Sequence, residues 1–180
     1  GIENDKVLSF MLEFSKYPNV VRLRGNHEDH LYRWAMGLKS YSRVFNEETA
    51  PQLETAGISK SDVLEFCHTL KDIVRFKYHE KTFTVTHAGL PFYPENHVIT
   101  LVPSRQYVFG IGHHSENIDE LWNKNTSSSQ YQIHGHRNNS RSPILSGRSI
   151  NLEGGVEFGG YLRMAEITRK GIKEVKIKQT

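Results

Sequence analysis

The chain has 180 residues, the usual length of one globular domain, and its 37% hydrophobic share is enough to build a core. Its formal net charge of +3 is far below that of a dedicated nucleic-acid binder. The one cysteine, Cys67, excludes a disulfide framework and a zinc site built from cysteines alone. No apolar stretch approaches the roughly 18 residues of a membrane span. We therefore expect a cytoplasmic protein without membrane contact, folded as a single domain over residues 1–180.

The first part of the chain predicts helices around one short strand. Residues 3–17 carry apolar side chains at helical spacing. Residues 20–24 are apolar enough to predict a short buried strand that ends at Gly25. Residues 30–71 then predict a helical excursion within the domain, in which Pro51 lies in the first turn of a helix.

The rest of the chain predicts mainly strands. Residues 74–78 and 82–86 alternate between polar and apolar positions, which indicates a hairpin. Residues 132–134 predict a brief strand, and the glycine-rich residues 149–177 predict further strands and a final hairpin. Helices and strands along one chain predict an α/β fold.

Three of the predicted strand ends share one pattern, an apolar stretch followed by a turn with glycine and histidine. They are Leu23-Arg-Gly-Asn-His-Glu28, Val85-Thr-His-Ala-Gly89 and Ile133-His-Gly-His136. Strand ends are rigid and glycine permits a tight turn, so side chains at such ends project into a shared crevice. Imidazole nitrogens together with amide or carboxylate oxygens suit Mn, Fe or Zn. The pattern therefore predicts a metal site.

In this order, Gly25-Asn26-His27-Glu28, His87-Ala88-Gly89-Leu90 and Gly135-His136 resemble the second half of the calcineurin-like metallophosphoesterases. The resemblance is to the branch with the Ser/Thr protein phosphatases, bacteriophage lambda phosphatase, diadenosine tetraphosphatases and polynucleotide phosphatase domains. It implies a β-sandwich flanked by helices and metal-dependent hydrolysis of phosphate monoesters. It also implies two divalent metal ions, Mn²⁺ in the first place, with Fe or Zn as alternatives.

The same resemblance implies roles for individual side chains. The metal ligands would be Asn26, His87 and His136. His27 would be the general acid that protonates the leaving alkoxide, and Arg24 would bind the phosphate.

Further cations follow later in the chain. Lys124 falls where related enzymes often have a phosphate-binding arginine, and as a lysine it offers a point charge rather than a fork. Together with Arg137, Arg141 and Arg148 it predicts either a basic rim near the site or a merely solvated face.

Two earlier motifs of these enzymes, Asp-x-His and Gly-Asp-x-x-Asp-Arg-Gly, occur nowhere in the chain. They supply the other metal ligands and a second phosphate-binding arginine. A helix and a strand follow Gly1 here, as they follow Asp-Arg-Gly in the family. We therefore expect a carboxy-terminal portion whose amino-terminal strands are missing and which by itself has little or no activity.

Each candidate also has a purely structural interpretation. Asn26 could cap a helix whose first turn contains Glu28. His87 could be a strand-end histidine, and His136 a loop histidine, that only form hydrogen bonds. His134 competes with His136 as a ligand, although its place before the glycine favours a supporting role.

The remaining histidines have weaker patterns. His113 and His114 are expected in a solvated or substrate-side loop. The others are expected to be surface or core fillers, namely His30, His68, His79 and His97. Cys67, on an apolar helix face, is expected to be buried and inert.

Three functional hypotheses follow. The first is a protein phosphatase-like phosphomonoesterase whose binuclear centre draws its second half from this chain. The second is a nucleic-acid end-processing phosphatase or a dinucleotide hydrolase. The third is an inactive metallophosphoesterase-like scaffold that binds partners. The expected substrate is accordingly a phosphorylated protein, a nucleotide or a nucleic-acid end, and the oligomeric state is left open.

Overall fold

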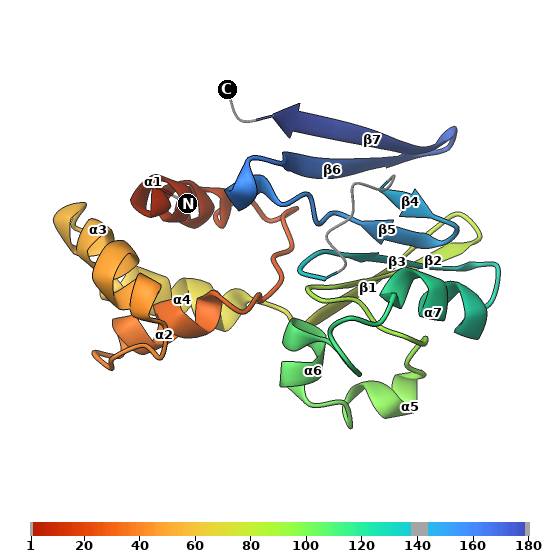
Figure 1. Ribbon diagram of the computed structural model, residues 1–180, viewed down its shortest axis with the longest axis horizontal. Coiled ribbons are helices and arrows are strands. Elements are labelled where there is room, and N and C mark those ends of the chain that lie inside the picture. The colour runs from red at the N-terminus through yellow and green to blue at the C-terminus, as the bar shows by residue number, and fades with distance from the viewer. Residues whose placement is uncertain (1, 138–143, 179–180) are drawn as a thin grey trace. The chain divides into compact units, whose positions relative to one another are not determined.

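The computed structural model describes residues 2–137 and 144–178 (Figure 1). The chain divides into two compact units, Gly1–Lys71 and Asp72–Thr180. Each unit is described by itself below. Whether residues 1–180 act as a single domain remains a prediction. Over the described residues, no helix is long and apolar enough to cross a membrane.

The first unit is helical. Its elements are α1 (Asn4–Phe14), α2 (Glu28–Ala35), the π-helical turn η1 (Phe45–Thr49), α3 (Ala50–Thr55) and α4 (Lys60–Thr69). The helix predicted for residues 3–17 is confirmed as α1. Pro51 lies in the first turn of α3, and Ser59 caps α4 by accepting a hydrogen bond from the Asp62 N–H at 3.3 Å.

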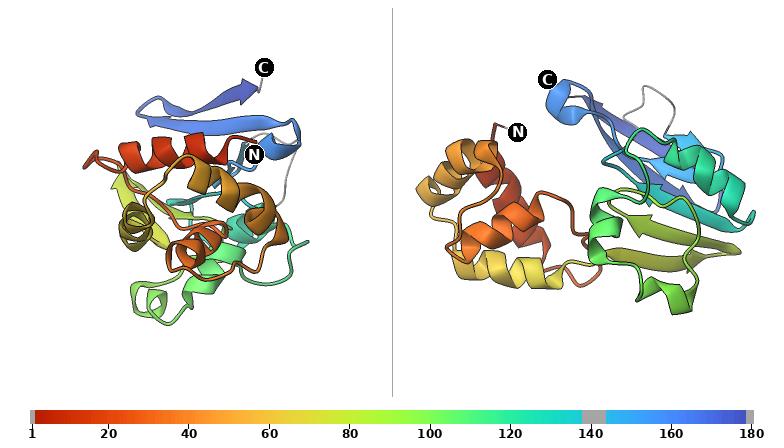
Figure 2. Two further views of the ribbon diagram at one scale, coloured as in Figure 1. Left: turned by 90° about the vertical axis from the view of Figure 1, so that its left-hand side faces the viewer. Right: turned by 60° about the horizontal axis from the view of Figure 1, so that its bottom comes forward.

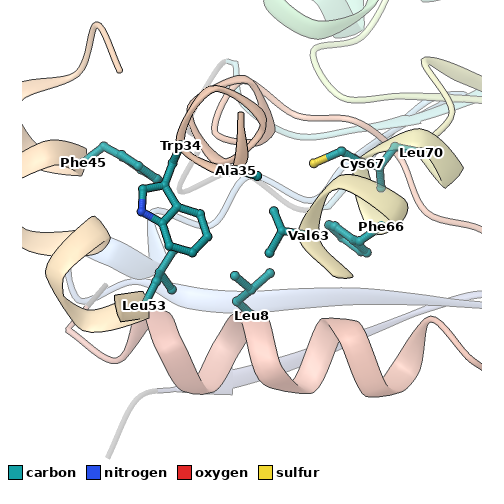
Figure 3. Close-up of a cluster of buried hydrophobic side chains, with 9 residues drawn as sticks. All are labelled: Leu8, Trp34, Ala35, Phe45, Leu53, Val63, Phe66, Cys67 and Leu70. Carbon is teal, nitrogen blue, oxygen red and sulfur yellow. The ribbon is translucent and has the colours of Figure 1, made fainter. Parts of the chain in front are cut away.

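A cluster of buried apolar side chains holds these helices together (Figure 3). It consists of Leu8, Trp34, Ala35, Phe45, Leu53, Val63, Phe66, Cys67 and Leu70. Every helix of the unit contributes to it, and each large side chain fully buried in this way stabilises the fold by roughly 1.5–3 kcal/mol. Cys67 is buried here, as its place on an apolar helix face predicts.

The buried strand expected at residues 20–24 is wrong. Val21 is 62% exposed, and the other four residues are half-buried. Over the described residues, this segment makes one isolated parallel bridge between Leu23 and Lys71. A single residue as partner cannot provide the ladder of hydrogen bonds that a strand requires. The segment still enters Gly25 in an extended form, anchored by the Arg24 N–H to the Lys71 carbonyl at 2.9 Å.

The second unit is built on strands. These are β1 (Ile73–Tyr78), β2 (Lys81–Thr86), β3 (Gln130–His134), β4 (Leu145–Ser146), β5 (Ser149–Asn151), β6 (Tyr161–Thr168) and β7 (Gly171–Lys178). Within the described residues they form a five-stranded sheet in the order β1-β2-β3-β5-β4 and a β6–β7 pair. Strand β3 is parallel to β2 and β5, whereas β1 and β4 are antiparallel edge strands. The predicted hairpin of residues 74–78 and 82–86 is confirmed as β1 and β2.

The β6–β7 pair forms a second layer of this unit, drawn in dark blue in Figures 1 and 2. Ala165, Ile167 and Ile172 pack on a cluster that includes Phe83 and Ile150 of the larger sheet. Helices α5 (Asn96–Ile99), α6 (Ser104–Phe109) and α7 (Ile118–Asn125) and the 3₁₀ turn η2 (Val156–Phe158) complete the unit. The result is the α/β fold that was expected, with a mixed sheet flanked by helices.

Candidate metal and phosphate site

Two of the three predicted metal ligands lie side by side. His87 directly follows β2, His136 follows β3, and the two strands are parallel, so both histidines leave the same edge of the sheet. The Gly135 N–H donates to the His87 carbonyl at 2.9 Å and ties the two turns together. The ring centroids of His87 and His136 are 4.8 Å apart. The turns at the carboxyl ends of β2 and β3 thus place two imidazole rings side by side.

His136 is held in a strained backbone conformation. Its φ is +62°, a left-handed value that is costly for a residue with a Cβ atom. The carboxylate of Glu153 accepts a hydrogen bond from the His136 N–H at 3.0 Å and another from the Gly155 N–H at 2.8 Å. Glu153 therefore fixes the turn that presents His136. Sequence reasoning missed it, although it follows the end of β5 at the same sheet edge.

Gly89 lets the first turn approach β3 closely. Its φ is +72°, and an added Cβ atom would lie 2.8 Å from both His134 Cγ and Ile118 Cγ2. Such contacts cannot form without movement, so the glycine after His87-Ala88 is required by the packing. The glycines of the motif thus have a steric role as well as a conformational one.

His134 belongs to a buried polar network below the site. Its Nε2 lies 2.9 Å from Asp119 Oδ1, which also accepts a hydrogen bond from Ser149 Oγ at 2.5 Å. Gln132 donates in turn to Ser149 Oγ at 2.8 Å. These groups join α7, β3 and β5, and all four residues are buried. His134 thus supports the strand that carries His136.

This network lowers the pKa of the Asp119 carboxyl group. Burial acts to raise its pKa, but the hydrogen bonds from His134 and Ser149 outweigh burial, so the pKa lies below its ordinary value. The network therefore contains a charged carboxylate near neutral pH.

The end of α6 and the loop that follows it bring an aromatic ring and a third histidine to the site. The ring centroid of His114 is 5.9 Å from that of His136, and the Phe109 ring is 6.4 Å from it. Both approach edge-on. His113 and His114 were expected in a solvated or substrate-side loop. Both side chains are exposed, and a substrate-side role stays a prediction.

Arg137 holds this loop in place. Its guanidinium donates to the carbonyls of Ile111, at 2.9 Å, and His113, and the residue is only 1% exposed. Arg148 likewise donates to the carbonyls of Asn123 and Thr126 at 2.6 and 3.0 Å. Both guanidinium groups are thus used inside the fold rather than on a basic rim.

The other predicted cations have different surroundings. Lys124 is exposed in the last turn of α7, where its ammonium group is available for an anion. Arg141 lies outside the described residues.

The candidate residues of the first unit surround the start of α2. His27 occupies its N-cap position with an exposed side chain, and Glu28 accepts a hydrogen bond from the Gly25 N–H at 2.6 Å. Over the described residues, no side chain at the N-cap position of α2 forms a capping hydrogen bond. The residue at the N-cap position of α2 is therefore His27 rather than Asn26.

Arg24 lines a cleft in the first unit. The cleft has a volume of about 300 Å³, and its other walls include Glu28, Asp29, Tyr32 and His68. Arg24 shares this cleft with the carboxylates of Glu28 and Asp29, so its role in binding phosphate stays a prediction.

The predicted site residues thus fall into two groups, one in each unit. One holds Arg24, Asn26 and His27 in the first unit, and the other holds His87 and His136 in the second. Over residues 2–137 and 144–178, no group of three or more His, Cys, Asp or Glu side chains is arranged to hold a metal ion. The histidine pair fits a divalent ion as two nitrogen ligands of its coordination shell.

The mixed sheet flanked by helices confirms the expected α/β fold class, and the fold is similar to that of a solved structure. The structure is similar to a crystal structure described as that of "a putative diadenosine tetraphosphatase", with a TM-score of 0.59 and 17% sequence identity. The match covers 92% of this chain and 72% of that one. No protein-family model matches the chain, and no curated protein matches it significantly in sequence. At this identity the likeness shows the fold.

Proposed function

We propose that the chain carries the second half of the active site of a metal-dependent phosphomonoesterase. The observation that supports this most is the pair of imidazoles, with ring centroids 4.8 Å apart, at the edge shared by two parallel strands. The fold, similar to that of a structure described as a phosphatase, supports the same class of reaction.

In this proposal Asn26, His87 and His136 hold divalent metal, with Mn²⁺ as the first choice and two ions in the complete centre. A bound divalent ion would activate water and neutralise the charge on the phosphoryl group. A complete binuclear centre needs carboxylate ligands beyond these side chains, so this chain alone is expected to have little or no activity.

The other residues act on the substrate directly. Arg24 binds oxygens of the phosphate and orients it from within its cleft. Lys124, the second cation predicted for this role, lies in the last turn of α7, where the Trp122 indole N–H donates to the carbonyl of Gln130 at the amino end of β3. His136 follows the opposite end of that strand, so the proposal rests on Arg24 for this role. His27, exposed at the start of α2, gives its proton to the leaving alkoxide oxygen. Leaving-group protonation is worth roughly 10²-fold or more in rate.

Metal binding tests the first part of this proposal. Calorimetric titration of the chain with Mn²⁺ and Zn²⁺ should show binding that His87→Ala and His136→Ala each weaken roughly tenfold or more. The matched control is His79→Asn, which removes an exposed imidazole from the β1–β2 turn and suits the backbone there, whose φ is +54°. A wild-type chain that binds neither ion, or ligand variants that bind as well as the control, would contradict the proposal.

Hydrolysis of p-nitrophenyl phosphate in Mn²⁺ tests the second part. An ordinary enzymatic rate from these 180 residues alone would show that they contain a whole site. If a longer form of the protein contains Asp-x-His and Gly-Asp-x-x-Asp-Arg-Gly, it should turn over the substrate. In that form His27→Asn should lower kcat roughly 10²-fold or more.

A dinucleotide hydrolase is the second candidate, because a similar solved structure is described as "a putative diadenosine tetraphosphatase". Rates on diadenosine tetraphosphate and on p-nitrophenyl phosphate, compared in the active form, separate the two candidates. The nucleic-acid alternative loses support because Arg137 and Arg148 bind backbone carbonyls. The scaffold alternative would be favoured by a chain that binds no metal.

A further inference from the structure

The second unit has a cleft at the end of the sheet opposite to His87. The cleft has a volume of about 230 Å³ and lies between the β1–β2 turn and the β6–β7 turn. His87 follows the carboxyl end of β2, whereas Lys81 at the amino end of β2 lines the cleft. The six-residue strand between them spans about 17 Å. This cleft is therefore separate from the candidate metal site.

The charged side chains that line the cleft are basic. They are Lys81 from the first turn and Arg169 and Lys170 from the second. Over the described residues, no aspartate or glutamate lines it, although Glu80 lies in the same turn as Lys81. Three cationic residues from two turns, without a carboxylate among the lining residues, create a positive potential that favours an anionic ligand.

The backbone that carries these cations is fixed by two tight turns. Each is a two-residue hairpin turn, closed by the pairs Tyr78–Lys81 and Thr168–Gly171. The Thr168 hydroxyl accepts a hydrogen bond from the Lys170 N–H at 3.2 Å and donates to the Gly171 carbonyl at 3.2 Å. The Lys81 ammonium lies 4.8 Å from the centre of the Tyr131 ring, which restrains it further. Lys81 therefore loses less side-chain freedom when an anion binds, whereas the exposed side chains of Arg169 and Lys170 are positioned only by their backbone.

The floor of the cleft is apolar. Phe83, Ile167 and Ile172 line it, and the same side chains pack the β6–β7 layer on the larger sheet. An inorganic anion would make no use of such a floor, whereas an anion with an apolar body would cover it. The volume is below the roughly 300–1,000 Å³ of pockets for drug-sized ligands, so the ligand is small.

We infer that this cleft binds a small organic phosphate, of nucleotide size at most. Its phosphate groups contact Lys81, Arg169 and Lys170, and its apolar body lies against Ile167 and Ile172. The inference goes beyond the proposed hydrolysis and does not depend on it, because the cleft shares no residue with that site.

The test uses ADP as the probe and the complete 180-residue chain in the presence of EDTA, so that metal-dependent binding is absent. Amide signals of residues 78–81 and 168–172 should shift in NMR titrations. The double variant Arg169→Ala/Lys170→Ala should bind ADP about tenfold more weakly, since two exposed charge pairs are lost. Both residues are exposed in a turn, and an unchanged melting temperature would confirm the fold. The matched control is Lys178→Ala, an exposed lysine at the far end of β7.

Adenosine and pyrophosphate separate the contribution of the apolar body to binding from that of the phosphate charge. Adenosine lacks the charge and pyrophosphate lacks the apolar body, so each should bind more weakly than ADP. The inference is overturned if ADP does not bind, if the double variant binds as well as Lys178→Ala, or if either fragment binds as well as ADP. Shifts confined to residues 25–28, 87 and 136 would place ADP in the candidate hydrolase site instead. An oligonucleotide that binds tenfold more tightly than ADP would assign the surface to nucleic acid.

Discussion

Asp119 is a buried carboxylate whose charge stabilises the contact between a helix and the sheet. It accepts hydrogen bonds from His134 and Ser149 and joins α7 to β3 and β5. Nothing in the sequence pattern singles it out, because its partners lie 15 and 30 residues away along the chain. Its importance follows only from the contact between a helix and the sheet.

Asp119→Asn should lower the free energy of unfolding at pH 7 by about 2–4 kcal/mol, because two buried donors lose a charged acceptor. The folded-state pKa of Asp119 lies below its ordinary value, so its contribution is present above pH 4 or so and is lost as pH falls through that folded pKa. The difference between wild type and variant should thus shrink in acid. Urea denaturation at pH 7 and pH 3 measures it. The exposed Glu120→Gln on the same helix is the control, and equal losses for both variants would contradict the prediction.

Cys67 provides the opposite pH dependence. Burial raises the pKa of its thiol to about 11, from a reference value of 9.0. The neutral thiol therefore stabilises the fold fully below pH 9, and this contribution, up to about 2 kcal/mol, is lost as pH rises from 9 towards 11. Denaturation curves at pH 8 and pH 10.5 should show the loss, and Cys67→Ala should reduce it. If the variant loses as much stability at pH 10.5 as wild type does, the loss comes from groups other than Cys67.

At the level of elements, the turn after β2 depends on a glycine for two separate reasons. Gly89 has a positive φ, and it also lies where a Cβ atom would collide with His134 and Ile118. Gly57 has a similar φ of +66° but nothing within 4 Å of such an atom. Substitution of the two glycines therefore distinguishes the cost of a strained backbone from the cost of a steric clash.

Gly57→Ala should lower the free energy of unfolding by about 1 kcal/mol, the usual cost of placing a Cβ atom in this backbone region. Gly89→Ala should lower it by roughly 2–4 kcal/mol, because a clash in the core is added. Urea denaturation of both variants measures the difference. Equal effects would mean that the turn after β2 relaxes freely and that Gly89 is not a packing requirement.

The elements also show where sequence patterns mislead. Residues 20–24 are apolar and end at Gly25, as a buried strand would, yet they form one isolated bridge over the described residues. Local composition reports that a segment can form a strand, whereas its hydrogen-bonding partners decide whether it does. The hairpin of β1 and β2 was predictable because the partner strand lies two residues away.

At the level of the whole molecule, the first unit has a core of its own. Its buried cluster draws on every helix from α1 to α4 and on Leu70. Residues 1–71 expressed alone should therefore show a helical circular dichroism spectrum and a cooperative, low-temperature melting transition, since a core of this size is marginal. Trp34→Ala should abolish the transition, whereas exposed Tyr41→Ala should leave it unchanged. A helical signal that melts without cooperativity would show that the unit needs the rest of the chain.

The sequence by itself determined what depends on neighbours along the chain. Helix α1, the β1–β2 hairpin, the glycine turns and the order of the three histidine motifs all follow from local spacing and backbone preference. Only the tertiary structure decided which distant groups meet: Glu153 with the His136 N–H, Asp119 with His134, and Arg137 with the carbonyl of Ile111. The same holds for the cations of two separate turns around one cleft. Such contacts join residues 15 to almost 90 positions apart, and their formation depends on packing of the whole unit rather than on any local pattern.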